Sequence, residues 1–207
     1  MPVDLLTLVA FLPASLALNL TPGIDMLFSA AQGMRAGPRS AWAASAGIST
    51  GSLIHALVAG LGLAAVVAAV PGVLDALRWI GVAYLLWLAW RSIGAEPGKF
   101  GVAGLSPGRA FVDGMLVNLA NPKVFLFVLA FIPQFVDPAR PVVAQFLVFG
   151  LILAVGGFFI NGSVGAFAAQ AAYRIAGSPA ALRRVSYVSA AIFLILAVAL
   201  AVSHIAN

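Results

Sequence analysis

The chain has 207 residues, of which 63% are hydrophobic and 8% are charged, against about 25% charged residues in an average soluble domain. This composition excludes an ordinary soluble protein, because too few polar side chains remain to cover a surface in water. The formal net charge is +5, but the basic residues stand singly or in pairs between apolar stretches, which is typical of membrane topology and not of nucleic-acid binding.

Apolar stretches between turn and charge signals predict six transmembrane helices. In chain order they cover residues 5–32, 40–69, 73–93, 109–134, 142–172 and 185–205. The first four residues include an acid, Asp4, and lack the positive region of a cleavable signal, so we expect the first helix to stay in the mature protein. The sequence therefore predicts an all-α membrane protein with one transmembrane domain over residues 1–207.

Lysine and arginine alternate strongly between the connections that join these helices. Connections 35–39, 94–107 and 174–184, with the flanking Arg91 and Arg109, hold eight basic residues, whereas connections 71–78 and 137–141 hold two. The positive-inside rule places the basic-rich connections in the cytoplasm. Both termini are then predicted to face the opposite side, which is the periplasm if the membrane is a bacterial inner membrane.

The Gly- and Pro-rich stretch 94–108 is predicted to be a cytoplasmic linker between two halves, 1–93 and 109–207. Each half holds three helices, so the second half enters the membrane with inverted orientation. The halves share a local pattern, because "NLTPGIDMLF" at 19–28 resembles "NLANPKVFLF" at 118–127. Broken helices at corresponding places in inverted halves are typical of secondary transporters.

The first of these patterns contains an expected helix break. Pro22 lacks an N–H group and Gly23 adds backbone freedom. In lipid, the freed backbone groups must find partners on neighbouring helices or in a wet cavity, and Asn19 and Thr21 are placed to supply some of them. A simple kink is the alternative interpretation of Pro22, and Pro122 is the corresponding break in the second half.

Two charged residues are predicted near the membrane centre. Asp25 lies ten residues from Arg35, about 15 Å along a helix. Lys123 lies fourteen residues from both Arg109 and Asp137, about 21 Å from either end. A charge at this depth costs at least about 2.5–3.5 kcal/mol unless it is paired, hydrated or protonated. Asp25 and Lys123 are therefore either a substrate or coupling site, which the adjacent breaks favour, or a static ion pair between the halves.

Other polar residues at similar depth are His55, Asn121 and Asn161. A simple hydrogen bond to a neighbour is the alternative for His55. Asp113 is different, because it follows Arg109 by four residues near the end of its helix. That spacing predicts an exposed ion pair.

The segment "GISTG" at 47–51 fits the G-x-S-x-G pattern of hydrolases. That motif needs a strand–turn–helix context, whereas this segment lies inside an apolar helix. An intramembrane hydrolase would use Ser49 and His55, which face different sides of a straight helix. Gly47 and Gly51 instead form a G-x-x-x-G pair, which predicts close helix packing within one chain or between two.

These motifs resemble the LysE/RhtB family of bacterial amino-acid exporters along nearly the whole chain. The resemblance is carried by "TPGID" at 21–25, "RWIGVAYLLWLAWR" at 78–91 and "FVDGMLVNLANPKVFLFVLAFIPQF" at 111–135. Ile24 stands where the family usually has a second proline. The resemblance implies six helices, residence in the inner membrane, and export of an amino acid or close derivative driven by the proton gradient.

We therefore predict a secondary transporter in the lipid bilayer, not an enzyme, with an amino acid and protons as its ligands and with no cofactor. The sequence is compatible with a monomer or a homo-oligomer. Export of a metal cation or other small solute is the alternative, although it would favour clustered His, Cys or carboxylate ligands. The predicted substrate or coupling residues are Asp25, Lys123, Asn121, Asn19, Thr21, Asn118, Asn161 and His55.

Overall fold

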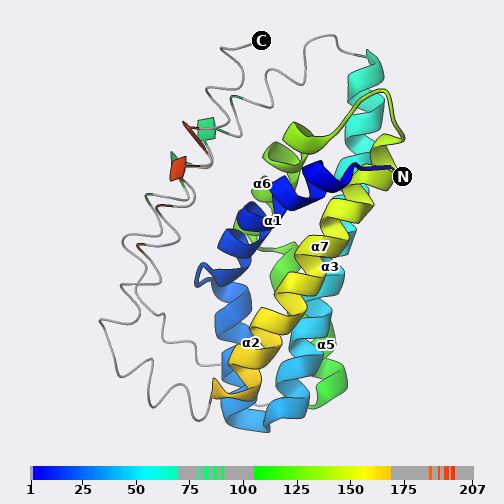
Figure 1. Cartoon of the computed structure of the whole chain (residues 1–207). Helices are drawn as coiled ribbons and strands as arrows, with labels where there is room; N and C mark the ends of the chain where they lie inside the picture. Colours follow the sequence, from blue (N-terminus) through cyan, green and yellow to red (C-terminus); the bar gives the residue numbers. More distant parts are fainter. Residues whose placement is uncertain are drawn as a thin grey trace.

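A computed structural model describes residues 2–69 and 105–168 of the chain, and single positions between 79 and 198. Every secondary-structure element in the two continuous stretches is a helix (Figure 1). The helices predicted at 73–93 and 185–205 lie outside these stretches. The connections at 71–78 and 174–184, and most of the predicted linker, also lie outside the described residues.

Two of the described helices are unbroken, and the others form two bent pairs. The unbroken helices are α3 (Pro38–Ala69) and α7 (Val142–Ala166), and both are long and apolar enough to cross a membrane. Helix α1 (Leu5–Leu20) meets α2 (Ile24–Ala36) at a bend of 54°. Helix α5 (Pro107–Leu119) meets α6 (Pro122–Ala130), which the 3₁₀ helix η1 (Ile132–Phe135) follows, at a bend of 56°. If each bent pair is one span, the described residues cross the membrane up to four times.

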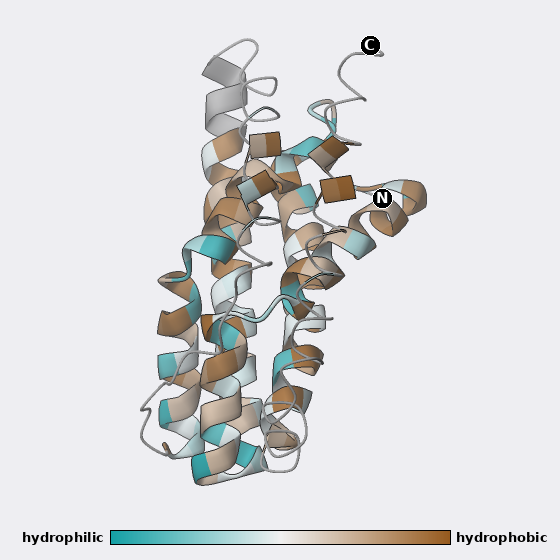
Figure 2. Cartoon of the chain, turned by 90° about the vertical axis from the view of Figure 1, so that its left-hand side faces the viewer, coloured by the Kyte–Doolittle hydropathy of each residue, from teal (hydrophilic) through white to brown (hydrophobic). Residues whose placement is uncertain are grey.

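The outward faces of these helices are apolar. Leu6, Leu151 and Phe159 are all largely exposed, and none of them has a polar group to place in water. Figure 2 shows hydrophobic residues along the lengths of the helices, with hydrophilic residues at the lower end and at separate places further up. Such a surface is compatible with a lipid environment, in which exposed leucine and phenylalanine are favourable.

The first break follows from the local sequence. Thr21 and Gly23 both have extended backbone angles, and Pro22 lies between them without an N–H group. The second break ends with Pro122 as the first residue of α6, a position where its fixed φ angle suits a helix and its missing N–H costs nothing. Asn121 caps that helix, because its Oδ1 accepts a hydrogen bond of 3.0 Å from the Lys123 N–H group.

Glycines bring the helix backbones close together. A Cβ atom on Gly47 would overlap the carbonyl group of Phe111, and one on Gly114 would overlap the carbonyl group of Ala44. These contacts join α3 to α5 along their lengths. Gly51 also faces α5, where its missing side chain leaves room for Asn118. The predicted close packing at Gly47 and Gly51 is therefore confirmed, and it occurs within one chain.

Serine hydroxyls join α3 to α7 on another face. The Ser45 Oγ donates to the Phe158 carbonyl over 2.8 Å, and the Ser49 Oγ donates to the Ala154 carbonyl over 2.9 Å. One helical turn separates the two donors, so they lie on the same side of α3. In a membrane such bonds hold helices together at about 1 kcal/mol each.

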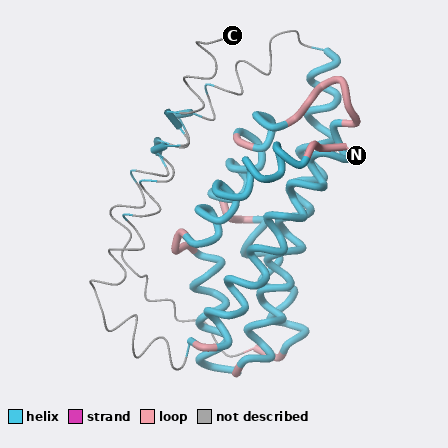
Figure 3. Tube along the Cα trace, in the orientation of Figure 1, coloured by secondary structure: helices cyan, strands magenta, loops and turns pink. Residues whose placement is uncertain are grey.

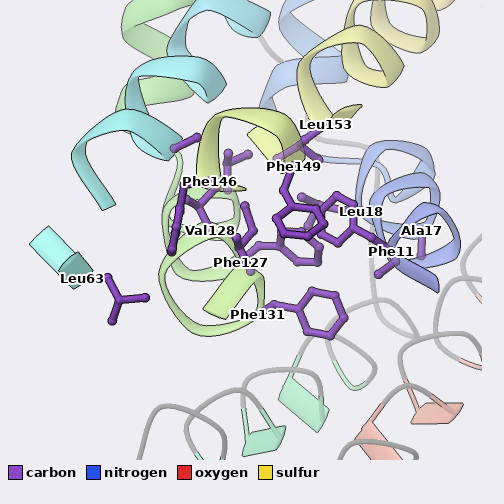
Figure 4. Close-up of a cluster of buried hydrophobic side chains, with 14 of the residues drawn as sticks. Phe11, Ala17, Leu18, Leu63, Phe127, Val128, Phe131, Phe146, Phe149 and Leu153 are labelled. Atoms are coloured by element: carbon purple, nitrogen blue, oxygen red, sulfur yellow. The ribbon is translucent and has the colours of Figure 1, made fainter. Parts of the chain in front are cut away.

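An aromatic cluster packs α1 against α6, η1 and α7 (Figure 4). The Phe11 ring lies 4.8 Å from the Phe149 ring and 6.2 Å from the Phe127 ring, measured between centroids. The Phe131 ring lies 4.8 Å from the Phe127 ring, tilted against it by 35°. All four side chains are fully or almost fully buried. The cluster therefore fixes the position of α1 beside the second bent pair, and with it the position of the first break.

The N-terminus and the connection at 137–141 lie at one end of the helices. Arg140 makes ion pairs with Asp4, at 2.9 Å, and with Asp137, at 3.1 Å. Both carboxylates favour the charged guanidinium and raise the pKa of Arg140 above its ordinary value, with Asp4 as the larger cause. The ion pairs join two parts of the chain that are 136 residues apart.

The corner between α2 and α3 lies at the other end, as the tube in Figure 3 shows. Gly37 forms this corner with a φ angle of 83°, a value that favours glycine. The Ser40 Oγ donates to the Leu105 carbonyl over 2.8 Å, and Leu105 N–H donates to the Gln32 Oε1 over 2.9 Å. The start of α5 is therefore attached to this corner. At the same end, the predicted Arg109–Asp113 ion pair is confirmed at 3.0 Å.

Candidate functional site

The two helix breaks lie side by side and share hydrogen bonds. The Lys123 ammonium, at the start of α6, donates to the carbonyl oxygens of Leu18 at 3.0 Å and Thr21 at 2.9 Å. In a continuous helix the Leu18 carbonyl would accept from the N–H group four residues later. That residue is Pro22, which has none. Lys123 therefore supplies the hydrogen bond that the proline removes.

At the second break, too, a side chain contacts the carbonyl that the proline leaves without its helical donor. The carbonyl four residues before Pro122 belongs to Asn118, and the His55 Nε2 from α3 lies 3.2 Å from it. Asn121 N–H also donates to this carbonyl, over 2.9 Å. When His55 donates here, its proton is on Nε2. At each break, a carbonyl that a proline leaves without its helical partner contacts a basic side chain from the other half of the sequence.

Asp25 lies just after the first break and is 8% exposed. Its Oδ2 accepts a hydrogen bond of 2.8 Å from the Asn118 side-chain amide. Asp25 is in the first turn of α2, where the helix dipole favours a negative charge. The Asn118 Oδ1 in turn accepts from Ser52 Oγ over 3.4 Å. These three side chains join α2, α5 and α3 through one polar chain.

Asp25 and Lys123 line the same small cavity. The cavity has a volume of about 10 Å³, which is about the space that one water molecule needs. Two polar atoms near it, Asp25 Oδ1 and Asn121 Nδ2, are buried without a hydrogen-bond partner in the described residues. The cavity is lined by Leu18, Asn19, Thr21, Gly23, Asp25, Met26, Lys123, Val124 and Asn161.

Asn19 attaches the first break to α7. Its Nδ2 donates to the Leu153 carbonyl over 3.1 Å. A Cβ atom on Gly157 would lie 3.1 Å from the Asn19 Oδ1, so that glycine keeps room for the amide. Asn161 lines the cavity from the same helix and is 4% exposed. The Thr21 hydroxyl bonds back to the Ala17 carbonyl over 2.6 Å and so completes the end of α1.

The predicted residues thus fall into two groups. Asn19, Thr21, Asp25, Lys123 and Asn161 line the cavity itself. Next to it, Asn118 binds Asp25 from α5 and meets His55 at its carbonyl, and Asn121 caps α6.

Sequence reasoning missed Ser52, and it assigned the freed backbone groups of the first break to the wrong partners. Lys123 binds the carbonyls there, whereas Asn19 bonds Leu153 and the Thr21 hydroxyl bonds Ala17. The Leu18 carbonyl had a signal, since it lies four residues before a proline. Ser52 had none, because a serine in an apolar helix commonly bonds its own backbone, as the Ser52 hydroxyl also does to the Ile48 carbonyl over 3.3 Å.

The described residues show neither the geometry of a hydrolase site nor that of a metal-cation site. Ser49 donates to α7 and His55 contacts α5, so the two side chains do not form a nucleophile–base pair. Among the described residues, no group of three or more His, Asp or Glu side chains is arranged to hold a metal ion.

The chain is similar to bacterial efflux and membrane proteins over most of its length. It is 36% identical over 149 residues to the homoserine/homoserine lactone efflux protein of Salmonella typhi, which covers 70% of this chain and 72% of that protein. It is 33% identical over 152 residues to an uncharacterized membrane protein of Vibrio cholerae serotype O1, with 72% and 74% covered. The leucine efflux protein of an Enterobacter species is 30% identical over 122 residues, with 57% and 58% covered.

No solved structure matches the chain. The LysE type translocator family matches residues 16–204, which is nearly the whole sequence. Family and relatives together make the protein a membrane transporter and not an enzyme. The chain belongs to the LysE type translocator family.

Proposed function

We propose that this translocator exports an amino acid or a close derivative across the bacterial inner membrane, coupled to the proton gradient. The observation that carries the proposal is the meeting of two helix breaks at a cavity that Asp25 and Lys123 both line. Opposite charges on broken helices suit a ligand that has both an ammonium and a carboxylate group. Relatives whose names include homoserine and leucine efflux support the substrate class.

The proposed architecture is six helices in two inverted halves, 1–93 and 109–207, joined by the cytoplasmic linker 94–108, with both termini in the periplasm. The crossed contacts of two asparagines support it. Asn19, before the first break, bonds α7 in the second half, and Asn118, before the second break, packs on Gly51 of α3 in the first half. Equivalent residues thus contact the unbroken helix of the opposite half, as a two-fold pseudo-symmetry requires.

In this proposal Lys123 binds the substrate carboxylate, and the ammonium group goes to Asp25 or to carbonyls at the first break. Asp25 carries the coupling proton, with His55 as the second candidate. The cavity has room for about one water molecule, so binding of an amino acid requires the segments around the breaks to move apart. Alternate opening toward the two sides of the membrane is the motion that transport needs.

The proposal is tested by export of a panel of labelled amino acids from proteoliposomes with and without a pH gradient. Asp25→Asn and Lys123→Gln should each abolish export while protein abundance stays near that of the unmodified chain. Arg140→Met is the matched control, because it removes a charge at the end of the helices and not at the breaks.

The double variant Asp25→Asn/Lys123→Gln separates a working site from a static ion pair. If the residues only stabilise the fold, each single variant leaves a buried charge without its partner and loses abundance, at a cost of about 3–5 kcal/mol. The double variant would then recover both abundance and export. Recovery of export in the double variant would contradict the proposed site, whereas recovery of abundance alone supports it.

A further inference from the structure

The carbonyl oxygens of Leu18 and Thr21 form a site for a primary ammonium group, and we refer to them as the carbonyl pair. We propose that Lys123 occupies the carbonyl pair as an internal ligand and that the ammonium group of an amino-acid substrate displaces it. This inference rests on the proposed function and deepens it, because it names the subsite for one end of the substrate and the group that competes for it.

The geometry of the carbonyl pair fits an ammonium group. The two oxygens lie 3.0 and 2.9 Å from Lys123 Nζ, so they use two of its three N–H donors. They are at the C-terminal end of α1, a helix of 16 residues, where the helix dipole places a partial negative charge. Pro22 removes the competing backbone donor from the Leu18 carbonyl. The site therefore favours a cation that donates hydrogen bonds.

Gly23 leaves the space that this cation needs. A Cβ atom at that position would lie 3.2 Å from Lys123 Nζ and 3.7 Å from its Cε. A side chain larger than a methyl group would enter the volume of the ammonium group itself. Asp25 lines the same cavity and adds a negative charge to the site without occupying the carbonyl pair.

The exchange explains why a zwitterion would be the preferred ligand. The α-ammonium group of an amino acid has the same charge and the same three donors as the Lys123 ammonium, so it can replace that group at the carbonyl pair. The displaced Lys123 can then bind the substrate carboxylate, and the net charge of the site does not change. An amine without a carboxylate would displace Lys123 and give it no anion in exchange, and an acid without an ammonium would not displace it.

The test is ligand-dependent thermal stability of the purified full-length protein in detergent, with methylammonium as the probe. In Lys123→Met the carbonyl pair has lost its internal ligand, so methylammonium should raise the unfolding temperature in a saturable manner, because it binds the folded state. The unmodified protein and Arg140→Met, which keep Lys123, should respond much less. Tetramethylammonium, which has the charge but no N–H donor, should have no effect in any of them.

A second variant blocks one oxygen of the carbonyl pair while the lysine is also absent. In Lys123→Met/Pro22→Ala, residue 22 regains an N–H group that can bond the Leu18 carbonyl and leaves only the Thr21 carbonyl for the cation, so the response to methylammonium should be much weaker. The proposal is wrong if methylammonium does not stabilise Lys123→Met, if tetramethylammonium stabilises it equally, or if the double variant responds as strongly as the single one.

Lys123→Met can also be tested if it folds poorly. Cell-free synthesis into liposomes with methylammonium should then raise its folded yield toward that of the unmodified chain, and synthesis with tetramethylammonium should not. An unchanged yield contradicts the proposal. These readouts do not use transport, so they separate the two claims. A methylammonium response without amino-acid export would contradict the proposed function and support the ammonium subsite. Export without the methylammonium response would contradict the subsite alone.

Discussion

Asn118 and Asp25 hold the two bent helices together through one hydrogen bond of 2.8 Å from an amide to a carboxylate. Asn118 is fully buried and has polar contacts on three sides, because its Oδ1 accepts from Ser52 and its backbone carbonyl meets His55. Asn118, four positions before Pro122, thus positions Asp25, which follows Pro22. The two breaks are one structural unit.

The Asn118–Asp25 bond should give a measurable coupling energy. We expect Asn118→Ala to destabilise the protein, because it leaves a buried carboxylate oxygen without its donor. In a double-mutant cycle with Asp25→Ala, which removes the acceptor, the two costs should fall short of additivity by about 1–2 kcal/mol, the value of one hydrogen bond in a largely water-free site. Reversible denaturation in detergent measures it. Strict additivity would mean that the bond contributes nothing to stability.

Gly51→Ala should disturb the same unit from the opposite side. Its Cβ would lie 2.7 Å from the Asn118 Oδ1 and 3.0 Å from the Asn118 Cβ, so the Asn118 side chain would have to shift, and its bond to Asp25 would be disturbed. We expect lower thermal stability and little or no export. Gly62→Ala is the control on the same helix, because nothing lies within 4 Å of its Cβ position.

In Gly62→Ala the added methyl group should leave export unchanged and stabilise α3 by about 0.5–1 kcal/mol through helix propensity. The pair of variants therefore separates a packing effect from a general effect of replacing glycine in a membrane helix. Equal behaviour of the two variants would argue against a specific contact at Gly51.

His55 should be replaceable by glutamine and not by leucine. Gln retains an N–H donor for the Asn118 carbonyl, whereas Leu removes it and should cost about 0.5–1.5 kcal/mol. We therefore expect His55→Gln to keep abundance and export, and His55→Leu to lower the unfolding temperature. Measuring export of the Gln variant at several pH values checks the assignment. If His55→Gln has normal abundance but no export, the coupling proton would have to be assigned to His55 and not to Asp25.

The orientation in the membrane can be read with single cysteines, since the chain has none of its own. Ala139 and Ala36 are both exposed and lie at opposite ends of the described helices. We expect a membrane-impermeant maleimide to label Ala139→Cys from the periplasmic side, and to reach Ala36→Cys only after the inner membrane is opened. The reverse pattern would invert the topology that the basic residues predict.

Local features of the fold could be predicted from the sequence because their causes are local. The apolar stretches, the small-residue packing at Gly47 and the i,i+4 pair of Arg109 with Asp113 each depend on residues within a turn or two. Pro22 and Pro122 similarly lie where the helices bend, since a missing N–H group acts on the carbonyl four residues earlier.

The partners across the site could not be predicted in the same way. Depth along the membrane placed Asp25 and Lys123 at comparable heights, but it does not set the rotation of either helix. In the structure, Lys123 donates to the carbonyls of Thr21 and Leu18, which lie 102 and 105 residues earlier in the chain. Asp25 accepts its hydrogen bond from Asn118. These contacts depend on how the aromatic cluster and the glycines dock the helices, which one sequence does not encode in a readable pattern.

The bond from Asn19 to α7 can form only late in biosynthesis. Its acceptor, the Leu153 carbonyl, is 134 residues further along the chain, so at 5–20 residues per second the ribosome needs roughly 7 to 27 s to make it. During that interval Asn19 and Asp25 lack the partners that they have in the folded protein, which is costly in bare lipid. We therefore expect the nascent first helix to stay in the insertion machinery or beside water until the second half is made, and we expect early release into the bilayer to favour misfolding.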